Sequence, residues 1–342
     1  MKALQWFGRR DLRIVDVAPP PDPGPGEVQV RVHWCGICGT DLEEWRNGPI
    51  FIPRGSDDFR PITLGHEVAG SVVSVGPSVM HLKVGQRVAV DGLTSCGACA
   101  ACLRGAAVLC PDLSSIGLMA DGGLAEFVNV PAKGAVAIPD HLRSDEATFA
   151  EPLAVGVRAL QRGGITPGMS VCVMGAGAVG ILAAQAANAY GASGVTIVDP
   201  QQARLDVARM VGIQRTLAPT EVGDDVFDLV LECSGNSLAI ALAVKVLNTA
   251  GTLVLVGLST TPVPLELLLV VTGEKTITGS LSHLFDSDFP EAVRLLAEGT
   301  VVARPLISSR VSLDQAMDAF ARLEKNSPQD LKVLVGEGEL SQ

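Results

Sequence analysis

The chain has 342 residues, which is enough for two domains of ordinary size. Hydrophobic residues make up 47% of it and charged residues 18%, the balance of a folded protein and not of a disordered one. The 26 Lys and Arg residues stand against 37 Asp and Glu residues, so the formal net charge is −11. Because nucleic acid is also negative, this charge argues against a DNA- or RNA-binding protein.

The N-terminal segment 1–17 has the pattern of one alternating strand and lacks the apolar stretch of a signal peptide. The longest apolar run, 265–271, contains Glu266 and is too short to cross a bilayer. We therefore expect a cytoplasmic protein that does not associate with membranes. In the cytoplasm, the eight cysteines indicate metal ligands or buried apolar side chains rather than disulfides.

Short β patterns separated by turn residues fill the chain up to about residue 150. The expected strands are 28–32, 67–75, 86–90 and 125–130. Aromatic residues are scarce, at 4%, so the core must be built mainly from aliphatic side chains. This part of the chain is expected to form a mainly-β domain.

Strands and helices alternate in the second half. After a helix at 150–160, buried strands are expected at 170–174, 194–198, 227–231 and 251–256, with helices at 181–190 and 238–247 between them. This alternation predicts a doubly wound parallel sheet. Further elements are expected at 289–298 (helix), 305–307 (strand), 313–323 (helix) and 331–335 (strand). Their pattern fits an extension of the sheet or a return to the first domain.

A glycine motif, Gly175-Ala-Gly177-Ala178-Val179-Gly180, lies between a buried strand and a helix. In that context G-x-G-x-x-G predicts a turn whose backbone N–H groups bind the pyrophosphate of a dinucleotide. Asp199 ends the next strand, where a carboxylate accepts hydrogen bonds from the adenosine ribose and repels a 2′-phosphate, so NAD is favoured over NADP. Arg204 argues for NADP instead, because an arginine near the ribose can bind the 2′-phosphate. The remaining predicted coenzyme contacts are Val256 and Leu258.

Four cysteines, Cys96, Cys99, Cys102 and Cys110, have the spacing C-x2-C-x2-C-x7-C. Four thiolates this close predict a tetrahedral zinc site with no open position, which is a structural role. An iron–sulfur cluster also takes four cysteines and is the chemical alternative. Two more candidate ligands, Cys38 and His66, lie on glycine-flanked turns. Taken singly, each has an ordinary packing explanation.

Together these motifs resemble the zinc-dependent medium-chain dehydrogenase/reductase superfamily, over nearly the whole chain. The resemblance rests on 36–41 (GICGTD), 65–67 (GHE), the cysteine lobe, Glu151-Pro152 and the glycine motif, which occur in that family's order. The segments 47–53 and 121–127 resemble most the (R,R)-2,3-butanediol dehydrogenase branch, which lies near the sorbitol and L-threonine dehydrogenases.

The resemblance implies an α/β protein with two domains and a cleft between them. A GroES-like mainly-β catalytic domain would span 1–152, with a structural zinc lobe at 92–112, and would be rejoined by 293–342. A Rossmann domain, the doubly wound parallel sheet, would span 153–292. The family assembles as homodimers or homotetramers, so a homo-oligomer is expected.

Carried onto this chain, the resemblance places a catalytic zinc on Cys38, His66 and a carboxylate, either Glu67 or Glu151. Bound zinc lowers the pKa of a substrate hydroxyl, and the alcohol then gives a hydride to NAD. Thr40 matches the position that accepts the substrate proton. Many relatives have a histidine three positions later, where this chain has Glu43. Glu43 or a water beside it is the expected relay, and a different exit route for the proton is the alternative.

The expected reaction is the oxidation of a secondary alcohol, with a vicinal diol such as 2,3-butanediol or a polyol as the favoured substrate. Sorbitol and L-threonine 3-dehydrogenase activities are the alternatives within the enzymes. An alternative of another class is a redox-inactive binding protein that has kept the fold. Cys35 is interpreted as a buried bystander, and Cys172 and Cys233 are not proposed as ligands.

Overall fold

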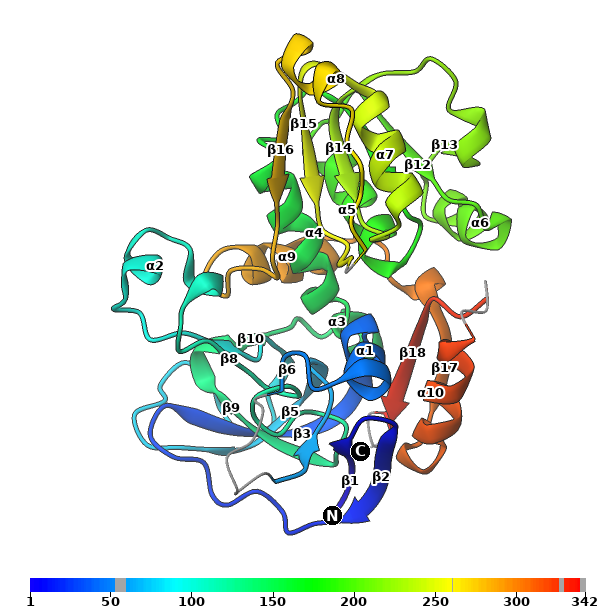
Figure 1. The fold of residues 1–342 in the computed structure, drawn as a ribbon. Coiled ribbons are helices and arrows are strands. Elements are labelled where there is room, and N and C mark those ends of the chain that lie inside the picture. Colours follow the sequence, from blue (N-terminus) through cyan, green and yellow to red (C-terminus); the bar gives the residue numbers. More distant parts are fainter. Residues whose placement is uncertain (53–59, 260, 326–328, 339–342) are drawn as a thin grey trace. The chain divides into compact units, whose positions relative to one another are not determined.

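The structure is a computed structural model that describes residues 1–52, 60–259, 261–325 and 329–338. Pro53, the last residue of the segment 47–53, lies outside the described residues. The chain divides into two compact units (Figure 1). The first unit comprises Met1–Glu151, Leu284–Ala297 and Ile307–Gln342, and the second comprises Pro152–His283 and Glu298–Leu306.

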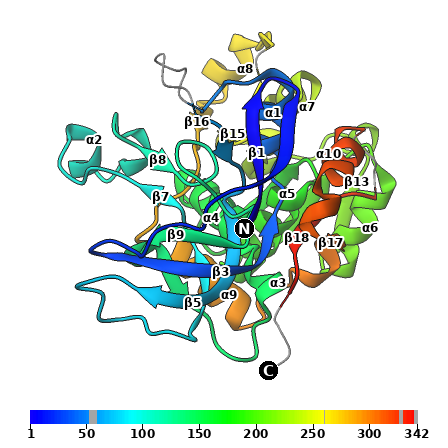
Figure 2. The ribbon, with the colours of Figure 1, turned by 90° about the horizontal axis from the view of Figure 1, so that it is seen from below.

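The first unit is built on a seven-stranded sheet. Its strands follow the order β10 (Ala135–Ala137), β6 (Arg87–Val90), β5 (Glu67–Val75), β3 (Glu27–Gly36), β18 (Lys332–Gly336) and β17 (Ile307–Val311). The seventh strand, β9 (Phe127–Pro131), also pairs with β3. Figure 2 shows β3 running between β9 and β5, so this one strand organises the sheet. The last strands of the chain therefore lie in the sheet of the first unit.

A smaller sheet of the order β2-β1-β4 packs in the same unit. It joins β1 (Lys2–Gly8), β2 (Asp11–Asp16) and β4 (Ile62–Thr63). The prediction of one strand over 1–17 is wrong, because β1 and β2 are two antiparallel strands of a hairpin. Arg10 has a φ of 63°, a turn conformation that strand alternation does not reveal.

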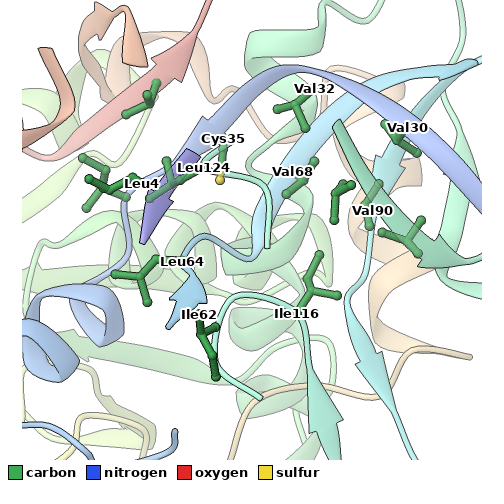
Figure 3. Close-up of a cluster of buried hydrophobic side chains, with 14 of the residues drawn as sticks. Leu4, Val30, Val32, Cys35, Ile62, Leu64, Val68, Val90, Ile116 and Leu124 are labelled. Atoms are coloured by element: carbon green, nitrogen blue, oxygen red, sulfur yellow. The ribbon is translucent and has the colours of Figure 1, made fainter. Parts of the chain in front are cut away.

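Aliphatic side chains from several strands fill the core of the first unit (Figure 3). Leu4, Leu64, Val68 and Leu124 are buried around Cys35, whose side chain is also fully buried. Cys35 is therefore a packing residue, and burial raises the pKa of its thiol well above the usual value.

The helices of the first unit are short. They are α1 (Gly39–Asn47), α3 (Ser144–Ala147), α9 (Asp288–Ala297) and α10 (Ala316–Glu324). A separate lobe carries α2 (Ala100–Leu103) and a turn of 3₁₀ helix at Ala107–Leu109, and the strands β7 (Leu93–Thr94) and β8 (Ser114–Ser115) form its base. Figure 1 shows α2 standing out from the sheet of its unit.

The second unit contains a six-stranded parallel sheet, as the alternating pattern predicted. Its order is β13 (Arg215–Leu217), β12 (Gly194–Val198), β11 (Ser170–Met174), β14 (Phe227–Glu232), β15 (Leu247–Leu255) and β16 (Thr276–Gly279). The helices are α4 (Ala150–Arg162), which begins two residues before the unit does, α5 (Ala178–Ala189), α6 (Gln202–Met210), α7 (Ser237–Lys245) and α8 (Leu267–Thr272). The chain runs from β11 to β12 and β13 on one side and then returns to β14 on the other side of β11, so the carboxyl end of β11 is the switch point where such sheets bind ligands.

One expected strand is misplaced. Residues 304–306 form a 3₁₀ helix, and β17 begins only at Ile307. Pro305 has no backbone N–H to give to a ladder, which explains why the strand starts after it. Among the described residues, no helix is long and apolar enough to cross a membrane.

Candidate metal centres and nucleotide site

Cys38 lies between β3 and α1, where the chain turns from the central strand into a helix. The backbone N–H of Cys38 donates to Oδ2 of Asp41 at 2.8 Å, which satisfies one of the free donors at the start of α1. This contact fixes the backbone that carries the Cys38 thiol. Sγ of Cys38 lies 3.7 Å from Oγ1 of Thr40, the predicted proton acceptor.

His66 and Glu67 lie at the start of β5, and the pairing of Gly36 with Glu67 brings that end of β5 beside the end of β3. The structure thereby gathers three of the predicted ligands. The ligand atoms of Cys38, His66 and Glu67 all lie within 4.8 Å of one another. His66 and Glu67 are buried, and Cys38 is half-buried.

A buried carboxylate, Asp41, faces the imidazole of His66. Nδ1 of His66 lies 3.6 Å from Oδ1 of Asp41, and neither atom has a hydrogen-bond partner. Burial alone would lower the pKa of His66, but the negative charges of Asp41 and Cys38 outweigh it and raise that pKa well above its usual value. Burial likewise raises the pKa of Asp41. A metal ion on the other nitrogen of His66 would let Nδ1 keep its proton and donate it to Asp41.

A lysine from the end of the chain contacts Glu67. Nζ of Lys332, on β18, lies 2.5 and 2.6 Å from the two carboxylate oxygens of Glu67, and it also donates to the carbonyl of Ile37 at 3.2 Å. The side chains of Lys332 and Glu67 are only 5% and 1% exposed. Burial would lower the pKa of Lys332, but the carboxylate of Glu67 outweighs it and raises that pKa. The ammonium group therefore stays charged and neutralises Glu67.

The other predicted catalytic residues are placed differently. Glu151 is in the first turn of α4 and is not part of the compact group of ligand atoms, although its charge acts on His66 and Lys332. Glu43 is on α1, and its carboxylate accepts a hydrogen bond from Nδ2 of Asn47 at 2.9 Å. Its role as a proton relay stays a prediction.

These residues fit a zinc ion. Thiolate, imidazole and carboxylate are the groups that hold zinc in catalytic sites, where three protein ligands leave the fourth position open. The unpartnered atoms of Asp41 and His66 would complete the support of the imidazole. The arrangement suits a metal that must bind a substrate oxygen.

The second cysteine group is equally compact. The sulfur atoms of Cys96, Cys99, Cys102 and Cys110 all lie within 4.8 Å of one another, with individual separations of 3.5 to 4.0 Å. Four sulfurs arranged tetrahedrally about 2.3 Å from a zinc ion would be about 3.8 Å apart. The lobe therefore fits a closed structural zinc site.

Backbone N–H groups of the lobe also point at the sulfurs. Those of Cys99 and Cys102 donate to the preceding cysteine of the motif at 3.3 and 3.5 Å, and Cys96 donates to Cys110 at 3.4 Å. Hydrogen bonds from the backbone, including Ala98 and Cys99, lower the pKa of Cys96 to about 7. Such donors stabilise the thiolate of Cys96, which is therefore prepared to lose its proton when a metal binds.

In the second unit, the glycine motif lies between β11 and α5. A Cβ on Gly180 would meet the carbonyl of Gly175 at 2.0 Å, so this position requires glycine for close packing. A Cβ on Gly177 would meet nothing within 4 Å, so the backbone there faces open space. No side chain caps α5, whose first N–H groups, from Ala178 to Gly180, can reach a phosphate.

Asp199 follows β12 at the same edge of the sheet. Its Oδ2 accepts the N–H of Ala176 in the glycine turn at 2.8 Å, and its Oδ1 accepts the N–H of Gln201, also at 2.8 Å. Asp199 therefore holds the turn in addition to its predicted role toward the ribose. Arg204 is on α6, which begins three residues after Asp199. Val256 and Leu258 follow β15 at this edge, and Leu258 is 67% exposed.

Two residues of the metal group were missed. Asp41 had a signal in the sequence, because an acidic residue three positions after Cys38 fits a capping box at a helix start. Lys332 had none, because it lies 265 positions from Glu67 and only the pairing of β18 with β3 brings the two together.

Comparisons with known proteins cover both units. Residues 24–140 match the family model of the alcohol dehydrogenase GroES-like domain, and residues 178–298 match that of the zinc-binding dehydrogenases. Sorbitol dehydrogenase from Bacillus subtilis (strain 168) is 33% identical over 98% of this chain and 97% of its own length.

Two solved structures are similar over the same extent. The crystal structure of 2R,3R-butanediol dehydrogenase from Bacillus subtilis is 30% identical, with a TM-score of 0.89 over 98% of this chain and 99% of that one. A zinc-binding dehydrogenase from Sinorhizobium meliloti 1021, solved with NADP, is 32% identical, with a TM-score of 0.88 over 98% of each chain. These matches confirm the predicted fold class, a GroES-like part followed by a Rossmann-like part.

Proposed function

Because this chain belongs to the zinc-dependent medium-chain dehydrogenase/reductase superfamily, we propose that it interconverts a secondary alcohol and a ketone with NAD as the hydride acceptor. The chain is an oxidoreductase that acts on alcohols. This excludes the alternative that it is a redox-inactive binding protein. The observation that carries the proposal is the gathering of Cys38, His66 and Glu67 around one point.

Cys38 and His66 would hold the catalytic zinc, with Glu67 or Glu151 as the third ligand. Bound zinc supplies a Lewis acid that lowers the pKa of an alcohol hydroxyl toward neutrality. Asp41 would keep the imidazole of His66 in the orientation and tautomer that metal binding needs. Lys332 already engages both oxygens of Glu67, so Glu67 would have to loosen this ion pair before ligating.

Thr40 would accept the proton of the substrate hydroxyl, because its own hydroxyl lies beside the Cys38 sulfur. Glu43, on the same helix, would pass the proton onward, directly or through water. Its hydrogen bond to Asn47 would have to break or be shared in that step.

The coenzyme would bind at the carboxyl edge of the parallel sheet, with its pyrophosphate on the glycine turn. The predicted contacts are Gly175, Gly177, Ala178, Val179, Gly180, Asp199, Arg204, Val256 and Leu258. The buried carboxylate of Asp199 supports NAD, because it would repel a 2′-phosphate. The similar structure that holds NADP makes the choice between the two coenzymes worth measuring.

The favoured substrates are vicinal diols and polyols, because a second hydroxyl can bond to a carboxylate of the metal group. The two named relatives act on a polyol and on a diol according to their names, which supports this class for the present chain. L-Threonine 3-dehydrogenase activity is the alternative. Specificity within a fold depends on the site, so it must be measured.

A substrate screen tests the proposal. The purified protein would be assayed at 340 nm with 2,3-butanediol stereoisomers, sorbitol and L-threonine, each with NAD and with NADP, before and after chelation. We expect turnover of a diol or polyol with NAD that is lost on chelation and restored by zinc. Absence of turnover with every alcohol, or turnover that survives complete zinc removal, would contradict the proposal.

The four-cysteine lobe is proposed to hold a structural zinc. Elemental analysis should find two zinc ions per chain and no iron. A visible absorption band with bound iron would instead indicate an iron–sulfur cluster, because zinc is colourless.

Three further expectations stay predictions. They are a homodimer or homotetramer, a cytoplasmic location, and the domain bounds 1–152 with 293–342 and 153–292. For the oligomer, α8 provides support in its exposed side chains Leu267, Leu268 and Val271, each about 70% exposed. Apolar side chains gathered in this way are typical of a protein interface.

A further inference from the structure

We propose that Glu232 is a positioning residue for the coenzyme. It fixes the loops that receive the nicotinamide half of the coenzyme, and it does not position the adenosine half. The inference rests on the proposed function, because it requires a dinucleotide at the carboxyl edge of the parallel sheet. Glu232 ends β14 at this edge and is fully buried. No motif in the sequence marks it.

The carboxylate of Glu232 binds the loop that follows its own strand. Oε1 accepts the N–H of Ser234 at 2.9 Å and that of Gly235 at 3.1 Å, and Oε2 accepts the N–H of Gly235 at 3.0 Å. The hydroxyl of Ser234 also donates to Oε1. Among the described residues, no cationic side chain forms an ion pair with Glu232. Its charge is therefore stabilised by the loop itself, and the loop in turn is fixed by that charge.

The backbone of Glu232 binds a second loop. Its carbonyl accepts the N–H groups of Val256 and Gly257, at 2.8 and 2.9 Å, just beyond β15. The two loops touch, since a Cβ on Gly257 would lie 2.1 Å from the nitrogen of Gly235. One residue thus joins both loops at the ends of β14 and β15, and the second loop carries the predicted coenzyme contacts Val256 and Leu258.

The strand order assigns these loops to one half of the coenzyme. Glu232 is in register with Met174, the last residue of β11 before the glycine turn, and a Cβ on Gly175 would meet Cβ of Ser234 at 3.1 Å. Asp199, the predicted ribose ligand, follows β12 on the opposite side of β11. A dinucleotide laid across this edge places its adenosine near β12 and its second nucleotide near β14 and β15. The Glu232 loops therefore face the nicotinamide half.

The same strand provides a matched control. Asp228, four residues before Glu232, also binds a neighbouring segment through its carboxylate. It accepts the N–H and the hydroxyl of Ser170, at 2.9 and 2.8 Å, and Nδ2 of Asn248 at 3.1 Å. It lies near the amino end of β14, away from the edge where the coenzyme is proposed to bind.

The test compares Glu232→Gln and Glu232→Asp with Asp228→Asn and the unaltered chain. Isothermal titration would give the Kd for NADH, and competition against NADH would give the Kd for 5′-AMP, which contains only the adenosine half. In Glu232→Gln, we expect the Kd for NADH to rise roughly tenfold, because the loops lose charge-assisted hydrogen bonds. The Kd for 5′-AMP should stay within about twofold, and Asp228→Asn should leave both values unchanged.

Glu232→Asp shows whether the position of the carboxylate matters, and it also serves if Glu232→Gln does not fold. Because the shorter side chain withdraws the carboxylate from Ser234, this variant too should weaken the binding of NADH more than the binding of 5′-AMP. Equal weakening of both ligands would indicate a general structural role and would overturn the inference. So would an unchanged Kd for NADH in both variants. If the unaltered chain binds neither NADH nor NADPH, the proposed function itself fails. That result comes from the unaltered chain, whereas the inference about Glu232 is tested by the variants.

Discussion

The ion pair of Lys332 with Glu67 has an energetic consequence at the scale of single residues. Removing one partner of a buried pair leaves the other charge without compensation, which is strongly destabilising. In this protein the partner left behind would be Glu67, which lies beside Cys38 and His66. A zinc ion at that point would compensate the same carboxylate. Lys332 and a bound zinc ion would therefore stabilise the same carboxylate in two different ways.

Lys332→Met should lower the free energy of unfolding of the zinc-free protein by about 3–5 kcal/mol. In the zinc-loaded protein the loss should be smaller, because Glu67 becomes free to ligate the metal. Urea denaturation with and without zinc measures both values.

Lys275→Met is the matched control for this variant. Lys275 also donates through Nζ to a backbone carbonyl, that of Val244 at 2.8 Å, but it forms no ion pair with a carboxylate among the described residues. The effect of Lys275→Met on the free energy of unfolding should be the same with and without zinc. An equal loss in both states of Lys332→Met would show that Lys332 does not act on the metal group.

Thr40→Ala should lower kcat by roughly 10²–10⁴-fold and leave two zinc ions per chain, because it removes the proposed proton acceptor and no metal ligand. Thr40→Ser, which keeps a hydroxyl, should retain most of the turnover. Steady-state kinetics and elemental analysis check both variants. Unchanged turnover in Thr40→Ala would remove Thr40 from the proton relay.

At the scale of elements, the cysteine lobe contains little that could hold it together without a metal. Its helix α2 has four residues, and its two strands have two residues each. Helices and hairpins of this length are not stable by themselves. A zinc ion held by the four cysteines would therefore supply much of the free energy that orders the lobe.

Cys99→Ser should reduce the zinc content from two ions per chain to one and make the lobe sensitive to proteases within 95–112. Mass spectrometry of limited digests and elemental analysis measure this. Cys172→Ala serves as the control, because Cys172 is buried in β11 outside both metal groups. It should keep both zinc ions. A protease-resistant lobe in Cys99→Ser would contradict the proposed structural role of zinc.

A buried carboxylate connects α3 to the C-terminal part of the first unit. Oδ2 of Asp145, on α3, lies 2.8 Å from Nη2 of Arg143 and 2.6 Å from Nη2 of Arg310 on β17. Burial would raise the pKa of Asp145, but the two guanidinium groups outweigh it and hold that pKa below its usual range. The stabilisation is therefore present above the unfolded pKa, about 3.9, and is lost as the pH falls through the folded pKa.

Asp145→Asn should lower the free energy of unfolding by about 2 kcal/mol between pH 5 and pH 8. The difference from the unaltered chain should shrink below about pH 4, where the aspartate of the unaltered chain becomes protonated. Urea denaturation across this range tests the prediction. A difference that stays constant down to pH 3 would show that the charge of Asp145 is not the cause.

Three strands were predictable to the residue. The strands β5, β11 and β12 coincide with their predicted ranges, because buried parallel strands and alternating strands bounded by turns have distinct patterns. The helix α6 and the edge strands β13 and β16 were not predicted, because short or exposed elements lack such a pattern. Lys332 shows the same limit for the site, since its partner is set by strand pairing and not by spacing.

At the scale of the whole molecule, the second unit has an edge that suits association with another copy. Among the described residues, β16 pairs only with β15, so one side of its backbone is free to extend the sheet. The exposed apolar side chains of α8 precede β16 in the chain. A second copy related by a twofold axis could cover both features.

Leu268→Glu combined with Val271→Lys should halve the mass of the oligomer, because charged side chains would replace apolar ones in the contact. Light scattering after size exclusion measures the mass. Met80→Glu is the control, since Met80 is 93% exposed in the first unit. An unchanged mass in the double variant would exclude α8 from the interface.

The sheet of the first unit is assembled from both ends of the chain, and this sets an order of events during synthesis. A ribosome releases the whole parallel-sheet segment, 152–283, before it makes β18. Until β18 emerges, β3 lacks one neighbour and Glu67 lacks its lysine. The turns that carry Cys38 and His66 are thus synthesised well before β18, so an ion arriving in that interval would meet Glu67 before any lysine holds it.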